Sequence, residues 1–289
     1  MRYKITLSYD GAPFCGWQRQ PDAPSVQEAL ETALQTLVGE PVAVTGAGRT
    51  DTGVSAVDYV AHFDAPKELD TERLACKLNA ILPVSVAVSS VVLAAPDFHA
   101  RFDARKRSYT YFLHRCKDPF LADRSYFYGY PEVDFELMNK AAAMLVGTHD
   151  FSCFQKVGSD NKTTVCTVFE AGWRPYFPAL ASDSSLFGTC PAIARQVNQE
   201  LAVNQTYANQ PKYWYFRISA DRFLRNMVRA IVGTLLEAGR GRRSPEDFAA
   251  LILPPDASSV QDGQAAPSRR SLAGESAPGH ALFLTGIEY

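Results

Sequence analysis

The sequence predicts an α+β fold with mostly antiparallel sheets flanked by helices. Two observations carry this prediction. Segments that alternate apolar and polar residues lie between segments of helical period, and the order strand–helix–strand–strand–helix–strand occurs twice in outline. Neither a regular strand–helix alternation nor a run of strands alone is present, which argues against the parallel α/β and all-β classes. We predict two linked halves, 1–104 and 105–289, that share no convincing internal repeat.

The N-terminal half begins with an alternating segment over 3–9, typical of a half-buried strand. A helix follows, for which Ser25 and Glu28 predict a capping box and Gly39 predicts the end. The remaining elements expected in this half are strands over 41–45, 56–63 and 84–93 and a helix around 74–82.

The C-terminal half is expected to contain further strands and helices, among them a helix of strong apolar periodicity. Asp134 predicts the cap of one helix, and Ser244 followed by Pro245 predicts the start of another. The expected ranges are strands over 106–115, 163–173, 213–219 and 281–289 and helices over 134–147, 222–239 and from 244 onward. Two polar segments without periodicity are expected to be a surface insertion, 178–211, and a loop, 254–278.

Composition narrows the class of protein. The 289 residues are 46% hydrophobic and 21% charged, which is enough apolar material for one or two cores. None of the six cysteines forms a CxxC pair, and no cysteine–histidine cluster has zinc-ligand spacing. The N-terminus is strand-like, and no apolar run reaches membrane-spanning length. We therefore expect a cytoplasmic protein with reduced thiols, no bound metal and no membrane contact.

Charge is uneven along the chain, although the formal net charge is only −2. Residues 217–243 contain seven arginines, and residues 99–124 contain seven Lys and Arg against three aspartates. Two such segments can line a groove for phosphates or form an ordinary solvated face. Charge alone does not choose between these interpretations.

The segment GAGRTDTGVSA, 46–56, is the most distinctive motif. Gly48 and Gly53 have the separation of a P-loop, but Val54 stands where that loop needs lysine, and strand-like sequence follows. A nucleotide-phosphate loop is therefore disfavoured. Asp51 has two remaining interpretations, an acceptor for turn amides or a catalytic carboxylate, and a positive Arg49 close to it would keep it ionised.

Two further groups have both a structural and a functional interpretation. Tyr109 and Tyr111 share one strand face, where core packing is the default and stacking on a base is the alternative. Arg225 and Arg229 are four residues apart, which predicts one helical face. An arginine at the border of an apolar face needs a carboxylate or phosphate partner, because an unpaired guanidinium there is costly.

A series of motifs covers most of the chain outside 178–211. In chain order they are YDGAPFCGWQRQPDAPSVQEALETAL, GRTDTGVSA, LNAILP, FHARFDARKRSYTYFL, LVGTHDFSCF, FLRNMVRAIVGTLLEAGRG and AGESAPGHALFLTGIEY. These motifs, in this order, resemble those of the tRNA pseudouridine synthase A family, and GRTDTGVSA is similar to the family's GRTDAGVHA. The family pattern is broken at four positions, where Ala, His, Arg and Gly are usual: Thr52, Ser55, Cys166 and Ala281.

The resemblance implies two α+β halves with RNA-recognition-like sheets and a catalytic cleft between them. It implies conversion of uridine to pseudouridine in the anticodon stem-loop of tRNA, by a homodimer that binds tRNA across both subunits. No cofactor is expected, because pseudouridine is an isomer of uridine. The runner-up is a non-catalytic tRNA-binding or tRNA-folding protein on the same scaffold.

The resemblance also implies roles for individual residues. Asp51 matches the catalytic aspartate, Tyr109 the active-site tyrosine, and Arg229 the arginine that pairs with the aspartate, for which we expect a two-point contact. Whether Asp51 attacks the sugar or the uracil ring is left open. Arg49 matches a residue linked to displacing the target base. Three further residues are expected to bind substrate: Thr50, Arg225 and Leu282.

Overall fold

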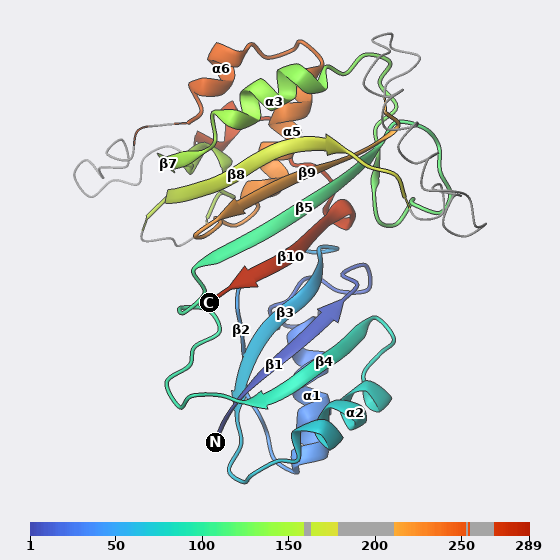
Figure 1. The fold of residues 1–289 in the computed structure, drawn as a ribbon, viewed down its shortest axis with the longest axis vertical. Helices are drawn as coiled ribbons and strands as arrows, with labels where there is room; N and C mark the ends of the chain where they lie inside the picture. Colours follow the sequence, from blue (N-terminus) through green and yellow to red (C-terminus); the bar gives the residue numbers. More distant parts are fainter. Residues whose placement is uncertain (159–162, 179–210, 253, 255–268) are drawn as a thin grey trace, which may run out of the picture.

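The computed structural model describes residues 1–158, 163–178, 211–252, 254 and 269–289 (Figure 1). The elements in chain order are β1 (Arg2–Tyr9), α1 (Val26–Val38), β2 (Val44–Gly46), β3 (Ser55–Asp64), α2 (Thr71–Ile81), β4 (Val86–Leu93), β5 (Lys106–His114), β6 (Tyr126–Phe127), α3 (Phe135–Ala143), β7 (Gly147–Asp150), η1 (Ser152–Phe154), β8 (Val165–Pro175), β9 (Tyr213–Ala220), α5 (Met227–Gly239), α6 (Pro245–Ala249), η4 (Arg269–Leu272), η5 (Gly279–Ala281) and β10 (Leu282–Glu288).

The strands form one continuous ten-stranded sheet in the order β4-β1-β3-β10-β5-β9-β8-β7, with β2 paired to β3 and β6 to β5. Most pairs are antiparallel, so the predicted α+β class is confirmed. The strand β10 is the link between the two ends of the sheet, because it pairs in parallel with β3 and antiparallel with β5. The sequence did not predict this joining of the C-terminal strand to an N-terminal one.

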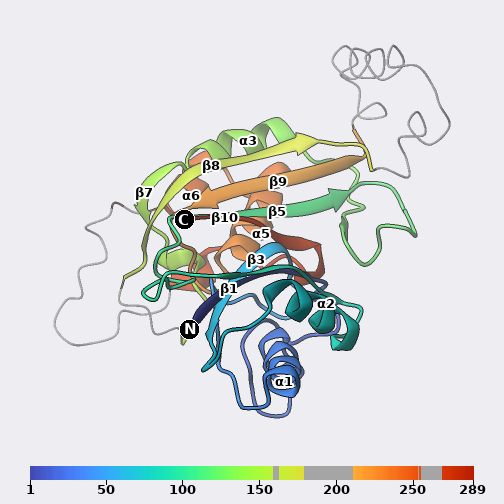
Figure 2. The same ribbon diagram turned by 60° about the horizontal axis from the view of Figure 1, so that its bottom comes forward.

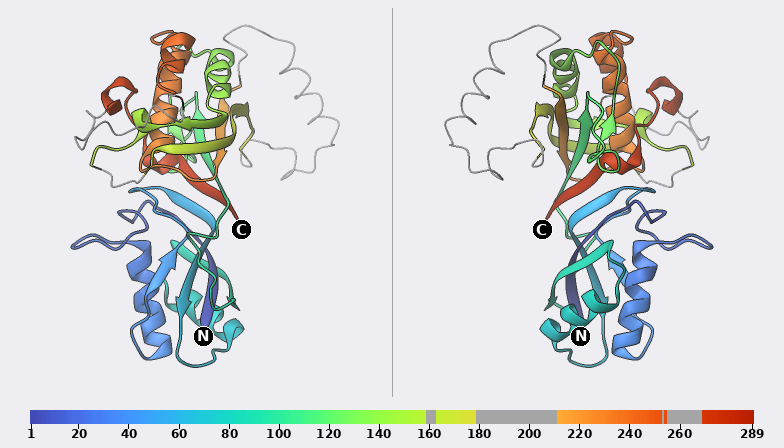
Figure 3. Two further views of the ribbon diagram at one scale, coloured as in Figure 1. Left: turned by 90° about the vertical axis from the view of Figure 1, so that its left-hand side faces the viewer. Right: turned by 90° about the vertical axis from the view of Figure 1, so that its right-hand side faces the viewer.

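Helices flank both ends of the sheet (Figures 2 and 3). The helix α2 packs against β4 and α1 lies beside it, whereas α3 packs against β8 and α5 lies beside α3. The apolar face of α5 is buried as predicted, including Met227, Val228, Ile231, Val232 and Leu235. No helix within the described ranges is long and apolar enough to cross a membrane.

The predicted helix ends are largely confirmed. Ser25 accepts a hydrogen bond from the Glu28 amide, and Gly39 ends α1 in the left-handed region, with φ of 91°. The capping box at Ser25 is half formed. The Glu28 carboxylate lies 3.6 Å from Arg19 and does not accept a hydrogen bond from the backbone amide of Ser25. Asp134 caps α3 through the amide of Leu137. The predicted strand over 84–93 and helix over 134–147 are shorter in the structure.

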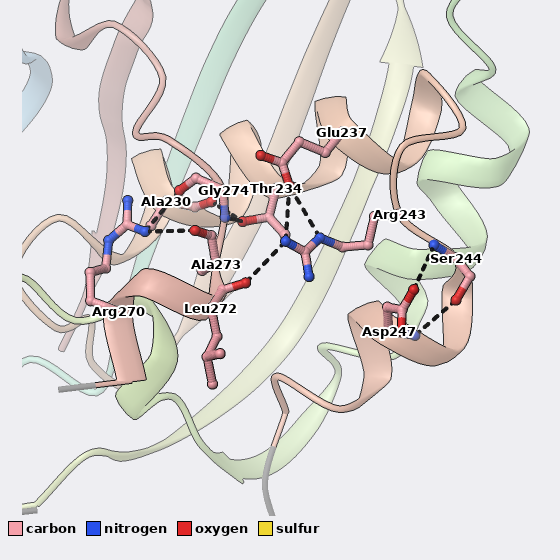
Figure 4. Close-up of polar contacts among 10 residues, drawn as sticks. All are labelled: Ala230, Thr234, Glu237, Arg243, Ser244, Asp247, Arg270, Leu272, Ala273 and Gly274. Carbon is pink, nitrogen blue, oxygen red and sulfur yellow. Dashed lines mark hydrogen bonds and ion pairs between the residues drawn. The ribbon is translucent and has the colours of Figure 1, made fainter. Parts of the chain in front are cut away.

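A complete capping box stands at α6, where Ser244 and Asp247 exchange hydrogen bonds (Figure 4). This helix ends at Ala249, so the predicted start is right although the helix is short.

The predicted helix over 222–239 is wrong at its N-terminus. It begins only at Met227, because Asn226 has φ of 66°, which a right-handed helix does not allow. Arg225 therefore lies in the turn before α5 and is exposed. The prediction that Arg225 and Arg229 share one helical face fails for this reason.

The segment 269–281, expected in part to be a loop, is fixed on α5 by polar contacts (Figure 4). The buried Thr234 hydroxyl donates to Ala230 and accepts from the amide of Gly274. Arg270 donates to the carbonyl oxygens of Ala273 and Gly274, so the segment is also held together by a hydrogen-bonded turn of its own.

An ion pair adds a second attachment. Arg243 lies 2.9 Å from the Glu237 carboxylate and also donates to the carbonyl of Leu272. Nearly all of the expected insertion 178–211, most of the expected loop 254–278 and Cys190 lie outside the described residues. The five cysteines that the structure describes are free thiols.

We expect Thr234→Val to lower the free energy of unfolding by about 1–3 kcal/mol, because it leaves the buried amide of Gly274 without its acceptor at nearly constant volume. The matched control is Thr36→Val, in which an exposed threonine also donates four residues back along a helix. Urea unfolding measures both changes. Equal effects at the two positions would contradict the anchoring role of Thr234.

Candidate active site

The turn between β2 and β3 carries Asp51 and is held tightly from several sides. The Trp17 amide donates to the carbonyl of Thr50 at 3.3 Å, and the Val54 amide donates to that of Asp51 at 3.1 Å. Gly53 has φ of 75°, which glycine adopts without strain. At Gly46 an added Cβ would lie 2.2 Å from the Tyr59 hydroxyl, so only glycine fits. The glycines thus allow the tight turn that fixes the position of the Asp51 carboxylate.

The hydroxyl groups of Thr50 and Ser55, which lie on either side of Asp51 in the sequence, form hydrogen bonds inside the protein. The Thr50 side chain is buried and shares a 2.9 Å hydrogen bond with the Tyr9 hydroxyl. Burial raises the pKa of Tyr9, so this group stays a neutral phenol. Ser55, where the family usually has histidine, accepts a hydrogen bond from the amide of Gly11 at 3.0 Å. Both side chains fix the turn to the end of β1.

Asp51 forms an ion pair with Arg229, the partner that the resemblance implied. Arg229 Nη1 and Asp51 Oδ2 are 3.5 Å apart, and the two side chains are 23% and 25% exposed. The expected two-point contact is not formed, because Arg229 Nε donates to the carbonyl of Ala277 at 2.7 Å instead. The single contact leaves the carboxylate partly open to solvent.

Residues 275–279 position both members of this pair. The Ala277 amide donates to the carbonyl of Arg229, so these two residues are bonded in both directions. At Gly233 an added Cβ would lie 1.7 Å from the carbonyl oxygen of Glu275, so α5 needs glycine where this segment crosses it. At Gly279 an added Cβ would lie 2.5 Å from the carbonyl oxygen of Thr52. The same segment therefore touches the helix of Arg229 and the turn of Asp51.

Arg49 is not the cation that faces Asp51. Its exposed side chain donates to Gln18 Oε1 at 3.2 Å. The guanidinium that pairs with Asp51 belongs to Arg229, so the expectation that Arg49 is the cation beside Asp51 is wrong. Arg225 is exposed in the turn before α5, and its carbonyl accepts from the amide of Lys156.

Tyr109 lies close to Asp51, at the centre of β5. Its side chain is buried, and its ring meets Phe223 edge to face at a centroid distance of 5.0 Å. Burial, reinforced by the Asp51 carboxylate and opposed by Arg107, raises the pKa of Tyr109. The phenol is therefore protonated at neutral pH, which disfavours a phenolate base.

The neighbouring residues on this face are also buried. Tyr111 pairs across the strands with Leu282, and both are almost fully enclosed. The Tyr111 hydroxyl has no hydrogen-bond partner among the described residues. Burial raises the pKa of Tyr111, and the nearby Arg229 opposes this rise. Tyr111 and the paired Leu282 thus form an apolar floor close to Arg229.

Arg107 is a site residue that the sequence analysis missed. Its guanidinium donates to the carbonyls of Ala47, before the Asp51 turn, and Asp221, at the end of β9, at 2.8 and 2.9 Å. Burial lowers the pKa of Arg107. The signal was present in the alternation of strand 106–114, because Arg107 falls on the same face as Tyr109 and Tyr111, where a cation needs partners.

Comparison with known proteins identifies the family. A family model described as tRNA pseudouridine synthase matches residues 141–289. A tRNA pseudouridine synthase A from Bacteroides thetaiotaomicron is 43% identical over 289 residues, which is all of this chain and 90% of the relative. Proteins of the same name from Porphyromonas gingivalis and Bacillus subtilis are 41% and 35% identical over all of this chain and 97% and 99% of their own lengths.

The chain belongs to the tRNA pseudouridine synthase family. This is a family of isomerases, so the enzyme class predicted from the motifs is confirmed. The site brings together a partly exposed carboxylate, a guanidinium that pairs with it and a buried phenol close by.

Most arginines in the two basic segments have structural partners. Arg124 pairs with Asp10, Arg217 with Glu170, and the Arg240 guanidinium lies 3.5 Å from the centroid of the Tyr130 ring. These contacts favour the structural interpretation for much of the charge, and the exposed side chain of Arg225 is an exception among the described residues.

We expect Arg107→Met to lower the free energy of unfolding by about 3 kcal/mol, because the carbonyls of Ala47 and Asp221 lose a charged donor. Turnover should fall as well, since the Asp51 turn is released from β9. The control is Arg105→Met, at an exposed position of the same segment. Urea unfolding and kcat measured together test this; an unchanged unfolding curve for Arg107→Met would remove the proposed clamp.

Proposed function

We propose that this protein isomerises uridine to pseudouridine in the anticodon stem-loop of tRNA, with Asp51 as nucleophile or base. The observation that carries the proposal is the Asp51–Arg229 pair. It is partly exposed and lies beside the buried Tyr109, in a chain of the tRNA pseudouridine synthase family. An ionised carboxylate at this position can react with an extruded nucleotide.

The reaction is balanced without any co-reactant. The bond between N1 of uracil and C1′ of the ribose breaks, a bond between C5 and C1′ forms, C5 loses a proton and N1 gains one. If Asp51 attacks C1′, a glycosyl ester forms and is displaced by C5, as a carboxylate does in retaining glycosidases. Addition of Asp51 to the uracil ring is the alternative that the proposal leaves open.

Other residues have supporting roles in the proposal. The target base must leave its stack, and the exposed Arg49 and Arg225 are placed to contact the RNA during this step. Thr50 and Leu282 are buried and contribute by shaping the turn and the floor of the site. The protein is also proposed to act in the cytoplasm as a homodimer that binds tRNA across both subunits. A solution mass of one chain would contradict the dimer.

The first prediction of this proposal is release of tritium from C5-labelled uridine in unmodified tRNA, without added cofactor. Asp51→Asn should bind tRNA with unchanged affinity and reduce release to background, because the amide cannot act as a nucleophile or base. The matched control is Asp58→Asn, at an exposed position of β3 with φ of 51°, which asparagine tolerates.

Two results would overturn this assignment. Binding of tRNA without tritium release by the wild type would support the non-catalytic tRNA-binding alternative. Near-normal release by Asp51→Asn would remove Asp51 from its role.

The second prediction concerns Tyr109. A protonated phenol can take up the C5 proton only if it gives its own proton to N1 of the uracil or to the nearby Asp51 carboxylate, so Tyr109→Phe should lower kcat by about 100-fold. Binding of tRNA should change less than twofold, because the ring remains. The control is Tyr111→Phe, on the same face, whose hydroxyl has no described partner. Single-turnover kinetics measure both variants, and wild-type kcat in Tyr109→Phe would exclude the hydroxyl from the reaction.

A further inference from the structure

A second concave site lies beside the Asp51 turn. It is a pocket of about 370 Å³ between the segment that follows β5 and the short helix η5. This volume is within the range of sites for small organic groups. The residues on which its chemistry depends are His114, Lys117, Ser125, Tyr126, Phe127 and His280.

The pocket lies beside the turn that carries Asp51. The last residues of β1 and β5 lie beside the first residues of β3 and β10, at one end of these strands (Figure 1). His280 lines the pocket, and its amide nitrogen lies 3.6 Å from the position that a Cβ on Gly53 would take. An ion pair of 3.3 Å between Arg124 and Asp10 ties the pocket segment to the end of β1. A group in the pocket therefore lies next to the turn that carries Asp51.

The walls of the pocket are suited to a planar, uncharged ring. Phe127 is 49% exposed, and its ring lies 5.5 Å from that of His114, tilted by 32°. His114 is buried and shares a 2.9 Å hydrogen bond with Ser125. Burial lowers the pKa of His114, so the imidazole is neutral at pH 7. Aromatic faces with neutral hydrogen-bonding groups are the means by which proteins hold unstacked bases.

A charged side chain at the rim of the pocket suits a phosphate group. Lys117 is exposed and supplies a cation for a phosphate. The one carboxylate in the lining, Asp118, is occupied within its own loop, since it accepts from the Tyr213 hydroxyl and from the amide of Phe120. The pocket therefore combines an aromatic face with an exposed cation, Lys117, at a rim whose one carboxylate already accepts hydrogen bonds.

We propose that this pocket holds the base of a nucleotide next to the target uridine, stacked on Phe127. This inference rests on the proposed function. Extrusion of the target base deprives its neighbours of a stacking partner, and an aromatic side chain replaces that contact. The pocket would thus stabilise the opened conformation of the RNA without taking part in bond breaking.

The test uses an anticodon stem-loop RNA that carries 2-aminopurine at either position beside the target uridine. Stacking on an aromatic ring should quench its fluorescence when the wild-type protein binds. Phe127→Ala should abolish the quenching at one of the two positions and weaken binding by about 10-fold. Phe127→Tyr, which keeps the ring, should restore both, and this rescue excludes a general folding defect.

Phe120→Ala is the matched control, because Phe120 is more exposed than Phe127 and lies outside the pocket, in the loop between β5 and β6. It should leave quenching and affinity unchanged. Equal quenching by the wild type and Phe127→Ala at both positions would overturn the inference, as would an equal loss in Phe120→Ala. Fluorescence does not require turnover, so normal tritium release without quenching refutes only the pocket, and quenching without release refutes only the isomerase.

Discussion

The position of β10 between β3 and β5 is the constraint on which the active site depends. This strand pairs on both sides, with Phe283 opposite Ser55 and Leu282 opposite Tyr111. The Asp51 turn leads into β3, Tyr109 and Arg107 stand on β5, and the segment before β10 holds Arg229 through Ala277. A one-residue slip of β10 would turn its side chains to the opposite face and separate these groups.

The geometry of Asp51 is a compromise between fixing a carboxylate and leaving it reactive. A buried two-point pair would hold it more firmly, but it would also occupy both oxygens and exclude the substrate. The single contact with Arg229 is only partly screened from water. Rigidity is supplied instead by hydrogen bonds around the turn, between the Thr50 and Tyr9 hydroxyls and from the Arg107 guanidinium to the carbonyl of Ala47.

Local features of the fold were predictable because neighbouring residues decide them. The caps at Ser25, Asp134 and Ser244 lie where the sequence placed them, since each cap needs only an amide three residues away. The start of α5 was not predictable, because apolar periodicity continued through 222–226 while Asn226 took the left-handed conformation. Periodicity indicates which face is buried but does not mark where the backbone leaves the helix.

The sequence by itself determined the α+β class, the tight glycine turn around Asp51 and, through its motifs, the isomerase family. The motif resemblance also named Arg229 as the partner of Asp51, and the tertiary structure shows how these two residues are brought together. Arg49 is close to Asp51 in sequence, yet it bonds to Gln18, whereas the distant Arg229 is brought to the carboxylate by α5 and the segment before β10. Side-chain partners across a fold depend on the packing of remote elements, and the spacing of residues along one strand or turn contains no information about that packing.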